Sequence, residues 1–323
     1  MDSPVRDLVV VGASAGGVAA LRLLASQLAP AFPATMAVVL HTGAHPSRLA
    51  QLLAASGPNA AGFAQHGDTL RPARIVTAVP DHHLLVRDGI FHLTRGPKER
   101  HTRPAIDPLF RSAALWGGPR VIGVLLSGRN DDGTAGMQAI RACGGVTIVQ
   151  DPEDAEEPAM PRSALDHVLV DHCAPLPKIA ELLGDLAGQP APAAFSPPEA
   201  LVREHAAALG EGEPAQQLRA IGMPSILTCP DCSGTLFEIA DTRPQRFRCH
   251  TGHAFTMKTL HAAQNELTEQ ALWSAIRALV EKETLLRRMS ALDRTAGDTE
   301  HAMESDAQAD RILQQINELR RLL

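Results

Sequence analysis

Short runs of apolar residues alternate with helical stretches along the first 185 residues. The runs are rich in valine and isoleucine and lack polar alternation, which is typical of strands buried on both faces of a parallel sheet. The predicted strands are residues 8–14, 36–41, 73–79, 121–128 and 146–151, and the predicted helices are 18–28, 46–55, 107–114 and 134–143. This alternation predicts an α/β fold with a doubly wound, mostly parallel sheet in a Rossmann-like three-layer arrangement. Within residues 81–94, Asp88-Gly89 between two apolar segments predicts a hairpin.

The pattern changes after residue 185. Residues 186–224 are rich in Ala, Pro, Glu and Gly, which predicts a flexible linker with room for one short helix. Residues 225–258 contain a cysteine cluster, and residues 259–323 are predicted to be helical with a weak break near residues 295–298. The a/d-like seam near the end fits either a helix packed on its own chain or a dimerising coiled coil. The seam consists of Ile312, Ile316, Leu319 and Leu323.

Four parts are therefore expected along the chain. They are a catalytic α/β domain (1–185), a Pro/Ala-rich linker (186–224), a cysteine-containing module (225–258) and C-terminal helices (259–323).

Composition and charge narrow the class of protein. A length of 323 residues suggests two or more folded units, and 45% hydrophobic with 20% charged residues is typical of a soluble globular protein. No apolar run is long enough to span a bilayer, and the polar first residues are unlike a signal peptide. A formal charge of −6 disfavours nonspecific binding to nucleic acid. Five cysteines, three of them clustered, indicate metal binding in a reducing compartment, so we expect a cytoplasmic protein.

The glycine-rich stretch GASAG (12–16) follows the first predicted strand and has the spacing G-x-S-x-G. A P-loop is excluded because no lysine follows the glycines. A dinucleotide site is excluded because the spacing is not G-x-G-x-x-G and the second strand ends in His41 rather than in an acid. A serine at a tight turn between a buried strand and a helix can be a nucleophile, with backbone N–H groups nearby to bind an oxyanion. Alternatively, Ser14 only caps the helix, and the motif alone does not decide between the two.

Two further positions strengthen the nucleophile hypothesis. A serine nucleophile needs a base, and the base needs an acid that orients it. Functional groups in a doubly wound sheet gather at the carboxyl ends of its strands. His41 ends the second predicted strand, and Asp131 and Asp132 follow the fourth. The sequence therefore predicts a Ser-His-Asp triad, in a chain order that differs from the Ser-Asp-His order of α/β-hydrolases.

Several longer motifs occur in the order found in CheB-type chemotaxis methylesterases, and the chain resembles this family over residues 5–182. The motifs are GASAGG (12–17), the histidine that ends the second strand, TRPAIDPLFRSAA (102–114), SGRNDDGTAGM (127–137), GGVTIVQDP (144–152) and AMPRSAL (159–165). The family's catalytic domain is a doubly wound α/β fold that hydrolyses γ-glutamyl methyl esters on chemoreceptors and deamidates certain receptor glutamines. The resemblance implies the same activity here, with no cofactor for catalysis.

The resemblance also implies roles for individual residues. Asp132 is preferred to Asp131 as the acid because it directly precedes Gly133, which ends the family's T-G-M-G-x-D-G pattern. The implied roles are nucleophile for Ser14, base for His41, orienting acid for Asp132, and backbone oxyanion donors at Ala15 and Arg129.

The chain departs from the family pattern at three positions. Arg129 replaces the methionine and Asn130 the following glycine of that pattern, and Ala159 replaces the glycine of the usual G-M-P. The family's response-regulator form carries a receiver domain before the catalytic domain, whereas here the catalytic strand begins within the first ten residues. We therefore expect no receiver domain, which leaves the C-terminal third as the candidate regulator.

The cysteine cluster has the spacing of a zinc ribbon. Cys229-Pro-Asp-Cys232 is followed after sixteen residues by Cys249, His250 and His253. Such a spacing predicts a closed structural site with four S/N ligands on a hairpin, and it disfavours three unrelated free cysteines. His253 is preferred as the fourth ligand because ligation by His250, adjacent to Cys249, would be strained. The form C-x-x-G-H also resembles the zinc tails of receiver-less CheB-like proteins.

These observations favour a methylesterase that acts on the cytoplasmic domain of methyl-accepting chemoreceptors. The C-terminal region is expected to bind signalling partners, and neither nucleic-acid binding nor membrane insertion is expected. The alternatives are a non-catalytic or weakly catalytic signalling scaffold and an esterase for another ester. A metal-dependent hydrolase is least favoured because the clustered ligands leave no open coordination position.

Overall fold

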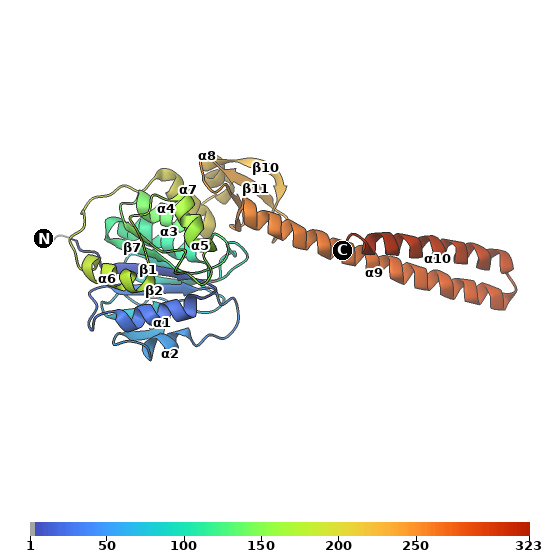
Figure 1. Cartoon of the computed structure of the whole chain (residues 1–323). Helices are drawn as coiled ribbons and strands as arrows, with labels where there is room; N and C mark the ends of the chain where they lie inside the picture. The colour runs from blue at the N-terminus through green and yellow to red at the C-terminus, as the bar shows by residue number, and fades with distance from the viewer. Residues whose placement is uncertain (1–3) are drawn as a thin grey trace. The chain divides into compact units, whose positions relative to one another are not determined.

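The computed structural model describes residues 4–323 and divides into two compact units (Figure 1). The first unit ends at Thr259, and the second spans Leu260–Leu323. None of the helices in the described part of the chain is both long and apolar enough to cross a membrane.

A seven-stranded parallel sheet forms the centre of the first unit, with the order β3-β4-β2-β1-β7-β8-β9. All five strands predicted from the apolar runs are present, and the two that were not predicted, β3 and β9, are the short edge strands. The strands are β1 (Leu8–Ala13), β2 (Thr35–Leu40), β3 (Ala60–Phe63), β4 (Arg74–Thr77), β7 (Val121–Leu125), β8 (Val146–Gln150) and β9 (His172–Ala174).

Helices cover both faces of this sheet, as the absence of polar alternation in the strands requires. In β1, Val9 and Val11 pack toward one layer of helices, while Leu8 and Val10 pack toward the other. The first layer is α1 (Gly17–Gln27), α2 (Leu49–Ala54) and α6 (Leu176–Leu186); the second is α3 (Ile106–Gly117), α4 (Thr134–Ala142) and α5 (Ala159–His167) (Figure 1). The predicted hairpin is formed by β5 (His83–Arg87) and β6 (Ile90–Thr94), which turn at Asp88-Gly89.

Residues 186–224 are more ordered than the expected linker. They contain two helices, α7 (Glu199–Leu209) and α8 (Pro214–Ile221), where we expected room for only one. Ala207 and Leu218 are buried against Phe237 of the sheet that follows. The two helices therefore contribute side chains to a small hydrophobic core, although the composition of the segment is typical of a linker.

A four-stranded antiparallel sheet follows, with the order β10-β11-β12-β13. We refer to residues 222–256 as the cysteine module. Its strands are β10 (Gly222–Thr228), β11 (Thr235–Ile239), β12 (Arg246–Cys249) and β13 (Ala254–Thr256).

The last two helices are α9 (Met257–Ala296) and α10 (Thr299–Arg320), and the chain turns at Gly297, within the expected break. Within the second unit, Ile312 and Ile316 of α10 are buried against Ile276 and Leu286 of α9. Leu319 also packs against this cluster, whereas Leu323 is exposed. Three of the four seam residues thus pack on their own chain, as in the first of the two alternatives drawn from the sequence.

Candidate active site

Ser14 lies at the turn between β1 and α1, directly after the strand. The neighbouring glycines have no room for side chains: a Cβ at Gly12 would lie 2.4 Å from Ile106 Cγ2, and Gly16 has a φ of +75°. The turn is held by a hydrogen bond of 2.9 Å from Ser14 N to Ser127 O. The glycine spacing thus serves a tight strand-to-helix turn that presents the serine hydroxyl.

His41 and Asp132 follow β2 and β7, which flank β1 in the sheet. Because the three strands are parallel, their carboxyl ends bring all three side chains together. His41 Nδ1 lies 3.1 Å from Ser14 Oγ, and His41 Nε2 lies 2.7 Å from Asp132 Oδ2. Asp131 does not contact His41 in this arrangement; its Oδ2 accepts a hydrogen bond of 2.6 Å from Thr256 Oγ1.

The carboxylate of Asp132 is buried and surrounded by donors. Its Oδ2 also accepts from Ile106 N at 2.7 Å, and its Oδ1 accepts from Gly133 N at 2.9 Å and from Arg100 Nη1 at 3.0 Å. Burial by itself would raise the pKa of Asp132, but the hydrogen bond and charge of His41, with the charge of Arg100, lower it to about 2. Asp132 is therefore ionised at neutral pH and can orient and stabilise a protonated His41.

Among residues 4–323, the backbone N–H groups of Ala15, which follows Ser14, and of Arg129 have no acceptor. The neighbouring Gly128 N, by contrast, donates to Glu157 O at 2.9 Å. Free amides beside a serine hydroxyl are the groups that can receive an oxyanion.

The three departures from the family pattern leave this geometry in place. The Arg129 side chain is exposed and pairs with Glu157 at 2.7 Å, so it does not enter the triad. Asn130 has a φ of +67°, a conformation that favours glycine but that asparagine tolerates better than most residues. Ala159 begins α5 and is followed by Met160, whose N–H donates to Gly128 O at 2.9 Å.

The four predicted metal ligands come together in the cysteine module. The donor atoms of Cys229, Cys232, Cys249 and His253 all lie within 4.8 Å of one another. Cys232 Sγ is 3.7 Å from Cys249 Sγ, and Cys249 Sγ is 3.5 Å from His253 Nδ1. His250 is exposed and is not part of this group. The cluster could hold a metal ion.

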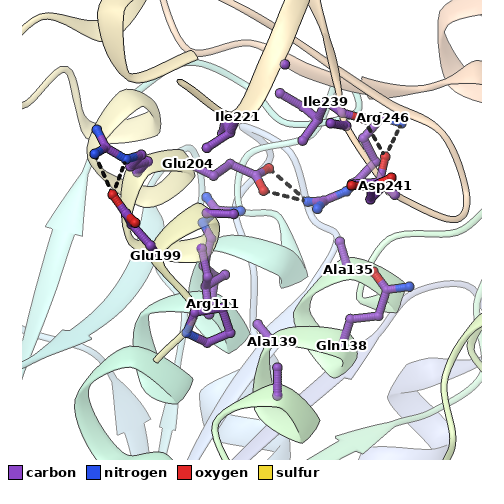
Figure 2. Close-up of a pocket in the computed structure, with 18 of the residues that line it drawn as sticks. Arg111, Ala135, Gln138, Ala139, Glu199, Glu204, Ile221, Ile239, Asp241 and Arg246 are labelled. Carbon is purple, nitrogen blue, oxygen red and sulfur yellow. Dashed lines mark hydrogen bonds and ion pairs between the residues drawn. The ribbon is translucent and has the colours of Figure 1, made fainter. Parts of the chain in front are cut away.

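A cavity of about 780 Å³ lies between the α/β domain and the cysteine module, away from the triad. It is lined by α3, α4, α7 and module residues, and Figure 2 shows Glu204 and Arg246 paired across it. The cavity is not lined by Ser14, His41 or Asp132. We therefore do not assign the reaction to this cavity despite its size.

Sequence reasoning missed Arg100, which contacts Asp132 from a loop before α3. No motif or spacing indicates Arg100, because its contacts with Asp107, Asp131 and Asp132 form only in the folded chain. Its neighbourhood in the sequence, KERHTRP, has the composition of an exposed basic loop, yet Arg100 is only 8% exposed.

Comparison with known proteins gives the same family as the motifs. The sequence matches the CheB methylesterase family over residues 9–183. A protein-glutamate methylesterase/protein-glutamine glutaminase 2 of Anaeromyxobacter dehalogenans is 38% identical over 181 residues, which are 56% of this chain and 53% of that protein. A putative protein-glutamate methylesterase/protein-glutamine glutaminase of Leptospira interrogans is 34% identical over 178 residues, 54% of this chain and 92% of that protein. The chain thus spans about half the length of the first relative and nearly all of the second.

A solved structure supports the fold. The crystal structure of the Thermotoga maritima CheB methylesterase catalytic domain is 31% identical in sequence and superposes with a TM-score of 0.53, covering 56% of this chain and 98% of that one. The α/β fold and the resemblance expected from the sequence are confirmed, and the chain belongs to the CheB methylesterase family.

Proposed function

We propose that the chain is a serine esterase that removes methyl groups from glutamate γ-methyl esters of methyl-accepting chemoreceptors. The observation that carries the proposal is the hydrogen-bonded series Ser14–His41–Asp132 at the ends of three adjacent strands. The names of the relatives, protein-glutamate methylesterase/protein-glutamine glutaminase, support this substrate class. All five cysteines are free, which fits a reducing compartment, so the proposal locates the reaction in the cytoplasm.

In the proposed reaction, His41 Nδ1 removes the proton of Ser14 Oγ as this oxygen attacks the ester carbonyl. The charge that develops on the carbonyl oxygen is stabilised by the N–H groups of Ala15 and Arg129. Asp132 accepts a hydrogen bond from the Nε2–H group, which keeps Nδ1 unprotonated and able to act as the base, and it stabilises the imidazolium that forms. His41 returns the proton to the departing methoxide as methanol. Water then attacks the acyl group on Ser14 by the same route and releases the glutamate.

Methanol release from a methylated cytoplasmic fragment of a chemoreceptor tests this proposal. The full chain should release methanol and Ser14→Ala should not. Ser26→Ala is the matched control, because Ser26 is exposed on α1 and its hydroxyl only bonds Leu23 O. A folded, metal-loaded protein that releases no methanol would contradict the proposal and favour the scaffold hypothesis or a different ester.

Deamidation of receptor glutamines is the second activity we propose for this site. The same acyl-enzyme forms when Ser14 attacks a side-chain amide, and His41 then protonates the amide nitrogen, which leaves as ammonia in place of methanol. Ammonia release from an unmethylated, glutamine-containing receptor fragment should be lost in Ser14→Ala together with methanol release. Loss of only one of the two would contradict a shared centre.

We further propose that the cluster of Cys229, Cys232, Cys249 and His253 binds structural zinc. Tetrahedral zinc with bonds of about 2.3 Å to sulfur and about 2.0 Å to nitrogen separates two sulfurs by about 3.8 Å and sulfur from nitrogen by about 3.5 Å. The 3.7 Å and 3.5 Å separations in the cluster fit these values. Four protein ligands leave no open position for a substrate, so this zinc would stabilise the module rather than take part in catalysis.

Metal analysis of the purified full chain should find about one zinc per chain. Cys232→Ser should lower this ratio, whereas Cys173→Ser, at an exposed cysteine outside the cluster, should not. An equal zinc content in both variants would refute the site.

A further inference from the structure

The loop at residues 99–103, between β6 and α3, connects the cysteine module with the triad. We propose that Arg100 in this loop is a positioning residue for Asp132, and that the metal-loaded cysteine module holds Arg100 in place. The inference rests on the proposed esterase reaction at Ser14. It assigns to the module, which lies outside the family match, a role in the catalytic centre.

On the side of the active site, a single guanidinium faces three buried carboxylates. Arg100 Nη1 donates to Asp132 Oδ1 at 3.0 Å and also to Asp107 Oδ2, and Arg100 Nε lies 3.1 Å from Asp131 Oδ1. All four side chains are less than 10% exposed. Buried carboxylates without a counter-charge are strongly unfavourable. Arg100 is therefore the cation that these three carboxylates share, and it holds in place the one that orients His41.

On the side of the module, the main chain of this loop is bonded to β13. Arg100 N donates to Ala254 O at 2.8 Å, and Glu99 forms a parallel bridge with the same residue. At the other end of β13, Thr256 Oγ1 donates to Asp131 Oδ2 at 2.6 Å. One short strand of the module thus contacts both the main chain that carries Arg100 and the carboxylate next to Asp132.

The metal cluster adjoins these contacts. His253 directly precedes Ala254, so the ligand and the residue that holds Arg100 are neighbours in the chain. The turn at 229–232 contacts the same loop, because Asp231 Oδ1 lies 3.2 Å from His101 Nδ1. A metal ion would join the 229–232 turn to the start of β13 and so fix both points that contact the loop.

Buried ion pairs attach the module to the α/β domain. Glu99 accepts from Arg111 of α3 at 2.6 Å and from Arg248 of β12 at 3.0 Å. Arg248 also pairs with Glu204 of α7 at 3.2 Å, and Figure 2 shows Glu204 held by Arg246 as well. Arg248 is 1% exposed. The module and the α/β domain therefore share a buried, ion-paired interface.

Three variants of the full chain test the role of Arg100 by methyl ester hydrolysis. Arg100→Met should lower kcat on the order of 10²-fold with little change in KM, because a small displacement of a catalytic group costs about this much. Arg100→Lys should recover part of the loss. Arg120→Met is the matched control, since Arg120 pairs with Asp7 at the opposite end of the sheet.

The pH profile separates positioning from a general loss of structure. The titratable and charged groups that face Asp132 are His41, Asp107, Asp131, Arg100 and, from β5, His83. Removing the cation leaves a more negative surrounding that favours protonated His41, so the acid limb of the kcat/KM profile should move to higher pH in Arg100→Met. Thr256→Val, which keeps all metal ligands, should shift this limb in the same direction with a smaller loss of rate. Wild-type rates in both variants, or losses without any shift of this limb, would overturn the inference.

Metal removal tests the role of the module. Chelation of the full chain, or Cys232→Ser, should slow both methanol release and labelling of Ser14 by a fluorophosphonate, and added zinc should restore both in the chelated wild type. If metal-free and zinc-loaded wild type label at the same rate, the inference fails while the proposed function stands. If zinc-loaded wild type neither labels nor releases methanol, the proposed function itself fails.

Discussion

Gly128 lies against the nucleophile and leaves no room for a side chain. A Cβ at this position would be 2.8 Å from Ser14 Cβ and 2.2 Å from Met160 Sδ. We predict that Gly128→Ala displaces Ser14 and lowers kcat for methyl ester hydrolysis on the order of 10²-fold. Gly184→Ala is the control, because a Cβ there meets no atom within 4 Å and the residue lies within α6. Equal rates in the two variants would show that the Ser14 turn tolerates displacement.

The acid of the triad can be identified by comparing two adjacent carboxylates. Asp132 accepts a hydrogen bond from His41 Nε2–H, whereas Asp131 accepts one from Thr256 Oγ1. Asp132→Asn should lower kcat by on the order of 10⁴ because the base loses the partner that fixes its tautomer. Asp131→Asn should lower kcat much less, since it weakens only the contacts of Asp131 with Thr256 and Arg100 and leaves the bond between Asp132 and His41 intact. A steady-state comparison that gives the reverse order would assign the acid to Asp131.

Residues at strand ends could be predicted from the sequence, because a parallel sheet brings such positions to one edge. His41 follows from this rule, and Ser14 follows from the rule together with the G-x-S-x-G spacing of residues 12–16. The choice of Asp132 over Asp131 needed the family pattern, since both follow the same strand. Arg100 could not be found, because its partners at positions 107, 131 and 132 meet it only in the folded chain.

At the scale of elements, the apolar runs predicted each buried strand but neither edge strand. β3 has four residues and β9 only three, and neither is as buried as the central strands. A run this short carries little hydrophobic signal. Only one of the two helices α7 and α8 was expected, because the composition of residues 186–224 is typical of linkers, although Ala207 and Leu218 belong to a small core.

The helical hairpin offers a test that separates its two apolar faces. Ile316 is 2% exposed and packs on α9, whereas Leu313 is 43% exposed. Ile316→Ala should destabilise the hairpin by roughly 2–5 kcal/mol, with Leu313→Ala close to neutral. Amide hydrogen exchange in α10 of the full chain measures this difference. Unchanged exchange in Ile316→Ala, with a loss of dimers, would instead support the coiled-coil alternative.

At the scale of the whole molecule, the stability of the first unit should depend on the protonation of His205. Burial, together with the charge of Arg111, lowers the pKa of His205 to about 3 from a usual 6.5. The unfolded chain therefore takes up a proton below pH 6.5 that the folded chain does not. The contribution of His205 to the free energy of unfolding is therefore fully present above pH 6.5. It is lost as the pH falls below this value, and the loss is about 2 kcal/mol at pH 5.

Urea unfolding at pH 7 and pH 5 measures this loss. His205→Gln should reduce the difference between the two pH values, whereas His45→Gln, at an exposed histidine, should leave it unchanged. An equal difference in both variants would assign the acid sensitivity to other groups.

The buried charges between module and domain also bear on how this architecture can change during evolution. Glu99, Arg111, Glu204 and Arg248 form one connected cluster, in which burial would raise the pKa of Glu99 but the two arginines hold it well below its usual range. Removing one member leaves its partners charged and unpaired in the interior, at a cost of about 3–5 kcal/mol, whereas an apolar replacement of the whole set need cost nothing. Related chains should therefore gain or lose these charges as a group. We therefore expect related chains to gain or lose the cysteine module together with this cluster, because substituting its charges one at a time would destabilise the fold.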